Sequence, residues 1–293
     1  MRLGAGRSRG WYGAMRGGVA GYWARSRSGR WAGIVGGGVI CLFVLAAALG
    51  PLIEPHAPNQ PLVGSAFQGP SAHYWFGTDQ LGRDEFSRVV AGAGIALGSA
   101  LGSVVVALVL GAVLGVVSGY RGGSWMDYGV SRGIDLLFAF PEYVLAIIVI
   151  AILGPGLINA ALAIGIVYTP RFARVVRVAT IEVMHCTYVE AARLAGRGRG
   201  FIVIRHVLPN VTSPLLVITA LSLSSAEGAY AALSFLGFGV PPPQADYGSM
   251  LGAAEPYLSS DPWLALFPSM ALVLLILGFN LFGDWLRDLL SRR

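Results

Sequence analysis

The sequence predicts an all-α, polytopic membrane protein with six transmembrane helices and one long loop that folds as a helical hairpin. Hydrophobic residues make up 55% of the 293 residues and charged residues 12%, whereas soluble domains carry about 25% charged residues. Six apolar runs approach the roughly 20 residues that a helix needs to cross a bilayer core. The charged residues gather between these runs, so the bilayer sets the architecture.

The expected spans, in order, cover residues 33–53, 93–119, 134–153, 157–177, 211–232 and 263–283. The fourth run is the weakest, because Pro170 and Arg171 interrupt it. Proline is tolerated in a bundle helix when neighbouring groups satisfy the freed carbonyl. Arg171, Arg174 and Arg177 recur at every third position, and we expect them to extend to one aqueous face.

Glycine spacing in the second run predicts close helix packing. Small residues on one helix face let two backbones approach, which favours association inside a lipid bilayer. Glycines recur at four-residue intervals in two sets, at Gly94, Gly98 and Gly102 and at Gly111, Gly115 and Gly119. Ordinary bundle packing and a dedicated subunit interface both fit this pattern.

Arginine placement predicts the orientation of the chain. All basic residues are arginine, and cytoplasmic loops of membrane proteins are enriched in basic residues. The first 30 residues and segment 178–210 are rich in arginine, while segment 233–262 has none. We therefore expect both termini in the cytoplasm, with residues 1–30 as a basic cytoplasmic tail and 31–290 as the transmembrane domain. A cleaved signal peptide is the alternative for the first run.

The net charge of +6 follows from these flanking arginines, which are typical of membrane insertion and not of nucleic-acid binding. Cys41 and Cys186 lie far apart in the sequence, and we expect two free thiols rather than a disulfide or a metal site.

The basic segment 178–210 predicts a hairpin of two short helices. Residues 188–195 favour a helix that Gly196 ends in a left-handed conformation. A second helix from about Gly200 to Val207 is expected to stop before Pro209. Ser213 then caps the next span, and Pro214 occupies its first turn.

The composition of this hairpin suits contact with another protein. Ala191, Ala192 and Gly196 form a surface of low relief that fits a groove, and Glu190 and Arg193 supply charges at its edge. A solvated amphipathic loop is the alternative interpretation of the same residues.

The order of motifs resembles the permeases of ABC importers. The characteristic loop of those permeases is present as Glu190-Ala191-Ala192, Gly196 and Leu208-Pro209. Further stretches resemble the DppC/OppC-type subunit of the dipeptide/oligopeptide/nickel branch, namely 76–84, 119–123, 140–141, 233–237 and 280–284. The resemblance extends over residues 31–290. Two positions depart from it: Tyr230 replaces a usual glutamate, and Tyr247 replaces a usual tryptophan.

This resemblance implies the type I importer permease fold and a set of partners. These are a second permease of DppB/OppB type, two ATP-binding subunits or one fused ATPase, and an extracytoplasmic binding protein. The resemblance places the chain in a bacterial inner membrane and assigns coupling to the ATPase to Glu190, Ala191, Ala192, Arg193, Gly196, Leu208 and Pro209. ATP and magnesium would be bound by the ATPase partners, so that this chain is itself no enzyme.

Two further sets of residues are candidates for contact with the substrate or the binding protein. Ionisable residues at membrane depth are functional candidates, which singles out Glu227 in the fifth span. Tyr230, Ser234 and Phe235 follow it and are candidates for the translocation path or its outer gate. In the segment before the second span, Asp79, Arg83 and Asp84 form a turn into an expected amphipathic interfacial helix and are candidates for binding-protein contact.

Residue patterns for catalysis are missing from the sequence. It lacks a phosphate-binding loop with its lysine, and it lacks a His-Glu-x-x-His or cysteine cluster for a metal. An ion-coupled secondary transporter remains a rival, although no internal repeat supports it, and an intramembrane hydrolase is a second rival. The substrate stays open between dipeptides, oligopeptides and a non-peptide solute such as a metal chelate.

Overall fold

Helices make up most of the described chain. The computed structural model describes the backbone of residues 9–290 and the side chains of residues 30–290. Within residues 9–290 the structure has helices and connecting loops but no β-strand, in agreement with the all-α prediction. Residues 1–8 and 291–293 of the basic termini lie outside the described residues.

The helices follow in this order: α1 (Arg9–Ile53), α2 (Glu85–Tyr120), α3 (Trp125–Phe138), α4 (Glu142–Leu153), α5 (Leu157–Met184), α6 (Thr187–Leu194), α7 (Arg199–Ile202), a π-helical turn η1 (Val203–Val207), α8 (Leu208–Phe235), α9 (Tyr247–Ala254), a 3₁₀ turn η2 (Glu255–Tyr257) and α10 (Trp263–Leu290).

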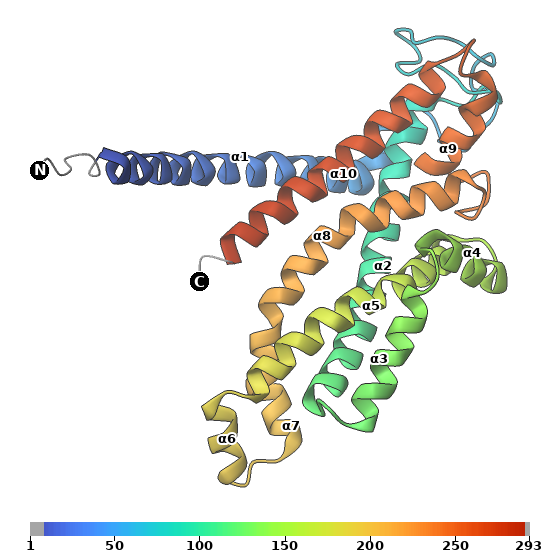
Figure 1. The fold of residues 1–293 in the computed structure, drawn as a ribbon. Helices are drawn as coiled ribbons and strands as arrows, with labels where there is room; N and C mark the ends of the chain where they lie inside the picture. The colour runs from blue at the N-terminus through green and yellow to red at the C-terminus, as the bar shows by residue number, and fades with distance from the viewer. Residues whose placement is uncertain (1–8, 291–293) are drawn as a thin grey trace, which may run out of the picture.

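Helices α2 and α5 run parallel to each other and form the centre of the bundle (Figure 1). Their backbones touch at the predicted glycines: a β-carbon at Gly115 would lie 2.7 Å from the carbonyl oxygen of Ala173, and one at Gly119 would lie 2.7 Å from that of Arg177. Such close approach is available to glycine alone among the residues. The glycine pattern therefore marks a packing surface within this chain.

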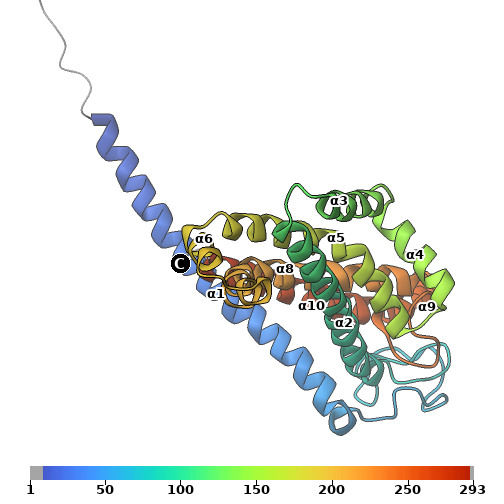
Figure 2. The same ribbon diagram turned by 90° about the horizontal axis from the view of Figure 1, so that it is seen from below.

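Helix α1 packs against α10, and its N-terminal half extends beyond the rest of the bundle (Figures 1 and 2). The contact is again made by small residues, since a β-carbon on Gly36 would lie 2.6 Å from the backbone nitrogen of Phe282. Helix α8 lies between α10 and α5 and completes the core.

The predicted number of six spans is approximate. Four helical stretches of the described chain are long and apolar enough to cross a membrane: Arg30–Ile53, Glu85–Tyr120, Arg199–Phe235 and Trp263–Leu290. Helix α5 is long enough, but its three arginines lower its apolarity.

The predicted third span, residues 134–153, is not one helix. Helices α3 and α4 meet at an angle of 96° and count together as a fifth, broken span. The break falls at Pro141, which has no amide hydrogen to donate and disfavours a helical conformation at the residue before it.

Three expected helix boundaries are wrong. Helix α2 begins at Glu85, so the expected amphipathic helix before residue 93 is the first part of α2 itself. The second hairpin helix does not stop before Pro209, because η1 joins α7 directly to α8. Pro209 lies in the first turn of α8, where its missing N–H costs little, and Ser213 and Pro214 lie inside that helix rather than at its start.

Candidate functional site

The motif residues Glu190–Gly196 form one arm of a hairpin at one end of the bundle, built from α6, α7 and η1 (Figure 1). Gly196 has a φ of +74°, in the left-handed region. The amide of Gly196 donates to the carbonyl of Arg193, and the amide of Arg197 donates to that of Ala192, both at 3.0 Å. This pair of bonds is a Schellman cap, and the predicted end of the helix is confirmed.

An apolar root fixes the hairpin to the bundle. Val189 of α6, Ile202 of α7 and Val207 of η1 are fully buried and pack with residues of α5 and α8, namely Val176, Val183 and Val211. Burying such side chains contributes roughly 1.5–3 kcal/mol each. The hairpin is therefore held at its base by packing.

The other side of the hairpin is open. Glu190, Ala191, Arg193 and Gly196 are exposed, and Ala192 is half-buried. Large apolar side chains stand beside them: Leu194 is 86% exposed and Ile204 is 68% exposed. Leu208 and Pro209, at the start of α8, are exposed as well. The motif residues thus share one end of the molecule.

Aromatic contacts connect the two arms of the hairpin. The ring centroids of Tyr188 and His206 are 5.4 Å apart, and those of Phe201 and His206 are 5.8 Å apart. The side-chain amide of Asn210 donates to the carbonyl of His206 at 2.7 Å. These contacts join α6 to η1 and α8 and hold the two arms of the hairpin together.

Three ion pairs between α5 and the α3–α4 unit were missed by the sequence analysis. Arg177 bonds Asp127 at 2.7 Å, Arg174 lies 3.8 Å from Asp135, and Arg171 bonds Glu142 at 2.6 Å. The expectation that these arginines extend to an aqueous face is therefore incomplete, since each has an acidic partner. A signal was present in the sequence: three acids in ascending order face three arginines in descending order, as two antiparallel elements require.

The candidate path residues on α8 differ in exposure. Glu227 is buried and accepts a hydrogen bond of 2.9 Å from Ser99 of α2. Tyr230 is fully buried, and the Ser234 hydroxyl donates to the Asp246 carboxylate. Phe235, at the end of α8, is 43% exposed. In this conformation three of the four side chains face the interior of the bundle.

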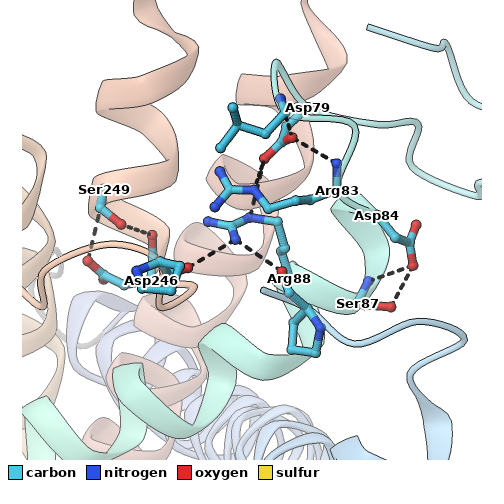
Figure 3. Close-up of polar contacts among 10 residues, drawn as sticks. Asp79, Arg83, Asp84, Ser87, Arg88, Asp246 and Ser249 are labelled. Atoms are coloured by element: carbon cyan, nitrogen blue, oxygen red, sulfur yellow. Dashed lines mark hydrogen bonds and ion pairs between the residues drawn. The ribbon is translucent and has the colours of Figure 1, made fainter. Parts of the chain in front are cut away.

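The end of the bundle opposite the hairpin is covered by a cap, which we define as residues 54–84 and 236–262. Asp79 accepts hydrogen bonds from the amides of Leu81 and Arg83, and its carboxylate bonds the Arg83 guanidinium at 2.6 Å. Arg88 of α2 lies 3.7 Å from the same carboxylate and donates to the carbonyls of Pro58 and Pro243 (Figure 3). Arg88 therefore connects both segments of the cap.

Carboxylates of the cap also accept hydrogen bonds at the first turns of α2 and α9. Asp84 accepts from the amide and hydroxyl of Ser87 at the start of α2, and Asp246 accepts from the amide of Ser249 at the start of α9 (Figure 3). Burial raises the pKa of Asp246 above its usual range, while its hydrogen bonds act in the opposite direction.

Asp79, Arg83 and Asp84 are all buried by their own chain. Their contact with a binding protein stays a prediction, and their burial favours an ordering role within the cap. Among the side chains of residues 30–290, no group of three or more His, Cys, Asp or Glu residues is arranged to hold a metal ion.

Comparison with known proteins gives the same picture. Residues 111–293 match the family described as binding-protein-dependent transport system inner membrane component. The chain is 42% identical over 258 residues to the dipeptide transport system permease protein DppC of Alkalihalophilus pseudofirmus, a match covering 88% of this chain and 84% of the relative. It is 40% identical over 253 residues to the glutathione transport system permease protein GsiD of Escherichia coli, covering 86% and 83%.

Solved structures agree in fold. The inward-facing MetNI methionine ABC transporter matches with a TM-score of 0.56 at 21% identity, covering 69% of this chain and 96% of that chain. An amino acid ABC transporter with histidines matches with a TM-score of 0.52 at 15% identity, covering 71% and 92%.

Proposed function

This chain belongs to the binding-protein-dependent transport system inner membrane components, the permeases of ABC importers, and on that premise we propose that its hairpin couples a peptide path to ATP hydrolysis. The expected DppC/OppC-type resemblance is confirmed. Glu190, Ala191, Ala192, Arg193, Gly196, Leu208 and Pro209 would form the contact with the ATPase. The chain itself would bind no ATP or magnesium and catalyse no reaction.

The observation that supports this coupling is the division of the hairpin into a packed root and an exposed side. A rigid base transmits force, while the exposed alanines, Leu194 and Ile204 leave an apolar surface without a partner in the described chain. Monomeric surfaces seldom leave contiguous apolar patches uncovered. A groove on an ATPase would bury this side and turn nucleotide-driven motion into movement of α5 and α8.

The proposed assembly contains four kinds of component. A second permease of DppB/OppB type completes the path, ATP-binding subunits dock at the hairpin, and an extracytoplasmic binding protein delivers the substrate at the cap. The proposed location is a bacterial inner membrane. Arginine placement then puts the hairpin, the basic tail of residues 1–30 and both termini in the cytoplasm, with residues 31–290 as the permease domain.

A di- or oligopeptide is the proposed substrate, because relatives of this chain are named for dipeptide and glutathione transport. Glu227, Tyr230, Ser234 and Phe235 would contribute to the path or its outer gate once the bundle opens. A non-peptide solute such as a metal chelate is the second candidate, because Tyr230 and Tyr247 depart from the branch at this end of α8. An ion-coupled transporter would leave the exposed hairpin without a role.

A matched pair of glycine variants tests the coupling. Gly196 and Gly237 both have positive φ, both form Schellman caps, and a β-carbon on either would meet no atom within 4 Å. Gly196→Asp and Gly237→Asp therefore impose similar backbone strain of about 1–2 kcal/mol. They differ in place, one on the hairpin and one in the cap.

We expect the ATPase to co-purify one-to-one with wild type and with Gly237→Asp, and to be lost from Gly196→Asp, which also abolishes uptake. Permease yield and melting temperature should be alike for the two variants. Retention of the ATPase and of normal uptake by Gly196→Asp would contradict the docking role.

A further inference from the structure

A polar groove of about 430 Å³ lies where α4, α5, α8 and α10 meet. Glu142 and Arg171 form its charged side, and Tyr168 lies beneath the guanidinium, whose central carbon is 4.7 Å from the ring centroid. Ser224, Ser225 and Asn280 line another part of the groove, and the Ser224 hydroxyl donates to the side-chain oxygen of Asn280 at 2.7 Å.

These polar groups lie far from the hairpin-side ends of α5 and α10. At 1.5 Å per residue, Arg171 is about 20 Å from the end of α5 at Met184, and Asn280 is about 15 Å from the end of α10 at Leu290. Ionisable groups in the interior of membrane helices face the inside of a bundle or a water-filled cavity, because exposure to lipid is costly. The groove is therefore a face that lipid does not cover.

The ion pair in this groove is well formed but accessible. The guanidinium and carboxylate are 2.6 Å apart, while the side chains remain 42% and 31% exposed. Pairs with such access to water are worth about 0–1 kcal/mol. Separating Glu142 from Arg171 therefore costs little free energy when the charges of a bound solute replace the contact.

We propose that this groove is part of the translocation path and that Glu142 and Arg171 hold the two ionised ends of a zwitterionic peptide. Glu142 accepts from the peptide ammonium, Arg171 donates to the peptide carboxylate, and Ser225 and Asn280 offer hydrogen bonds to the peptide amides. This inference rests on the proposed function and gives it a substrate class and a location.

The self-paired charges suit transport. Without substrate each charge neutralises the other, so the groove does not trap stray ions. With substrate two ion pairs replace one, and the net charge of the groove stays constant. A conduit requires binding strong enough for entry and weak enough for release, which an exchangeable ion pair provides.

Thiol labelling tests the path directly. In the assembled importer in lipid nanodiscs, with Cys41→Ser and Cys186→Ser, Ser225→Cys is treated with a charged, membrane-impermeant methanethiosulfonate reagent. Leu274→Cys is the control: Leu274 is exposed on α10 and, two residues from the groove-lining Ile276, is rotated by about 200° around the helix.

We expect Ser225→Cys to react and Leu274→Cys to remain unlabelled. Millimolar dipeptide, added without the binding protein, should slow labelling of Ser225→Cys, and the same dipeptide with an acetylated N-terminus and amidated C-terminus should not. An unreactive Ser225→Cys would mean that lipid or the second permease covers the groove, and equal protection by both peptides would mean that the charges are not recognised. Either result overturns the proposal.

Substitutions of Glu142 and Arg171 test whether these two charges bind the ends of the peptide. Glu142→Gln or Arg171→Gln should lower the protecting affinity of the dipeptide about tenfold, the value of one lost charged hydrogen bond of about 1.4 kcal/mol. Arg174→Gln is the matched control, because it removes another α5 ion pair, to Asp135, that does not line the groove. Unchanged protection in the Glu142 and Arg171 variants, or an equal loss in Arg174→Gln, contradicts the inference.

Labelling requires no ATP, so these results are independent of the hairpin. Loss of protection in the groove variants together with normal co-purification of the ATPase supports the inference. If Gly196→Asp retains the ATPase and normal uptake while the groove variants lose dipeptide protection, the coupling role alone is contradicted.

Discussion

The cap and the α6–α7 hairpin cover opposite ends of the same bundle, yet they treat their polar residues in opposite ways. In the cap, Asp79 and Arg83 are turned inward and pair with each other and with Arg88 of α2 (Figure 3). In the hairpin, Glu190 and Arg193 are turned outward beside exposed apolar side chains. Both regions contain a glycine-terminated Schellman cap, so the difference lies in the side chains.

This difference indicates where each region finds its partners. Buried charges are tolerated when paired and hydrogen-bonded, so the conformation of the cap is determined largely within this chain. The exposed side of the hairpin has no such internal complement among the described residues. Its complement is expected on another subunit, which is what the coupling role requires.

The largest effect is expected from a charge deleted in the cap. Arg83→Met leaves the buried Asp79 carboxylate without its nearest cation, which costs about 3 kcal/mol. We expect a marked fall in the melting temperature of the purified permease. Arg193→Met removes the same charge from the exposed hairpin and should change stability by less than about 0.5 kcal/mol. Equal stability of the two variants would remove the contrast between the regions.

A smaller effect is expected between the two ends, along the ion pairs of α5. Arg177→Gln breaks two bonds to Asp127, whose side chain is 7% exposed, and should cost about 2 kcal/mol. Arg174→Gln breaks a longer pair in which both side chains are more than half exposed, and should cost about 0.5 kcal/mol or less. Thermal unfolding of both variants in one detergent measures the difference, and a reversed order would show that burial does not govern these pairs.

The smallest effect concerns the hairpin root. Val189→Ala removes two buried methyl groups and should cost about 1.5 kcal/mol, whereas Leu194→Ala alters an exposed side chain and should leave the fold unchanged. Amide exchange in residues 187–207 should accelerate in the first variant alone. Accelerated exchange in Leu194→Ala would indicate that the exposed side also stabilises the isolated hairpin.

Features determined by local sequence were predicted well. Apolar length located most of the long helices, four-residue glycine spacing identified α2 as a closely packed helix, and Gly196 located the end of α6. Each of these depends on residues within one continuous stretch of the chain. The break at Pro141 was also visible locally, but the apolar run around it was given more weight than the missing amide hydrogen.

Features that join distant segments were not predicted. Glu142 pairs with a residue 29 positions away, and Arg88 reaches a carbonyl 155 positions away. Composition cannot choose among the available acids and arginines, because the choice depends on how the helices pack. The burial of Asp79, Arg83 and Asp84 was missed for the same reason: Asp79 and Arg83 lie beside residues 250–254 of α9, and Asp84 lies beside His56.

The most direct test of the coupling role is the accessibility of Ala191, which is exposed in this chain. In a background of Cys41→Ser and Cys186→Ser, Ala191→Cys should react quickly with a small maleimide in the isolated permease and become protected when the ATPase subunits are bound. Equal reactivity in the isolated permease and in the complete importer would contradict the coupling role of the hairpin.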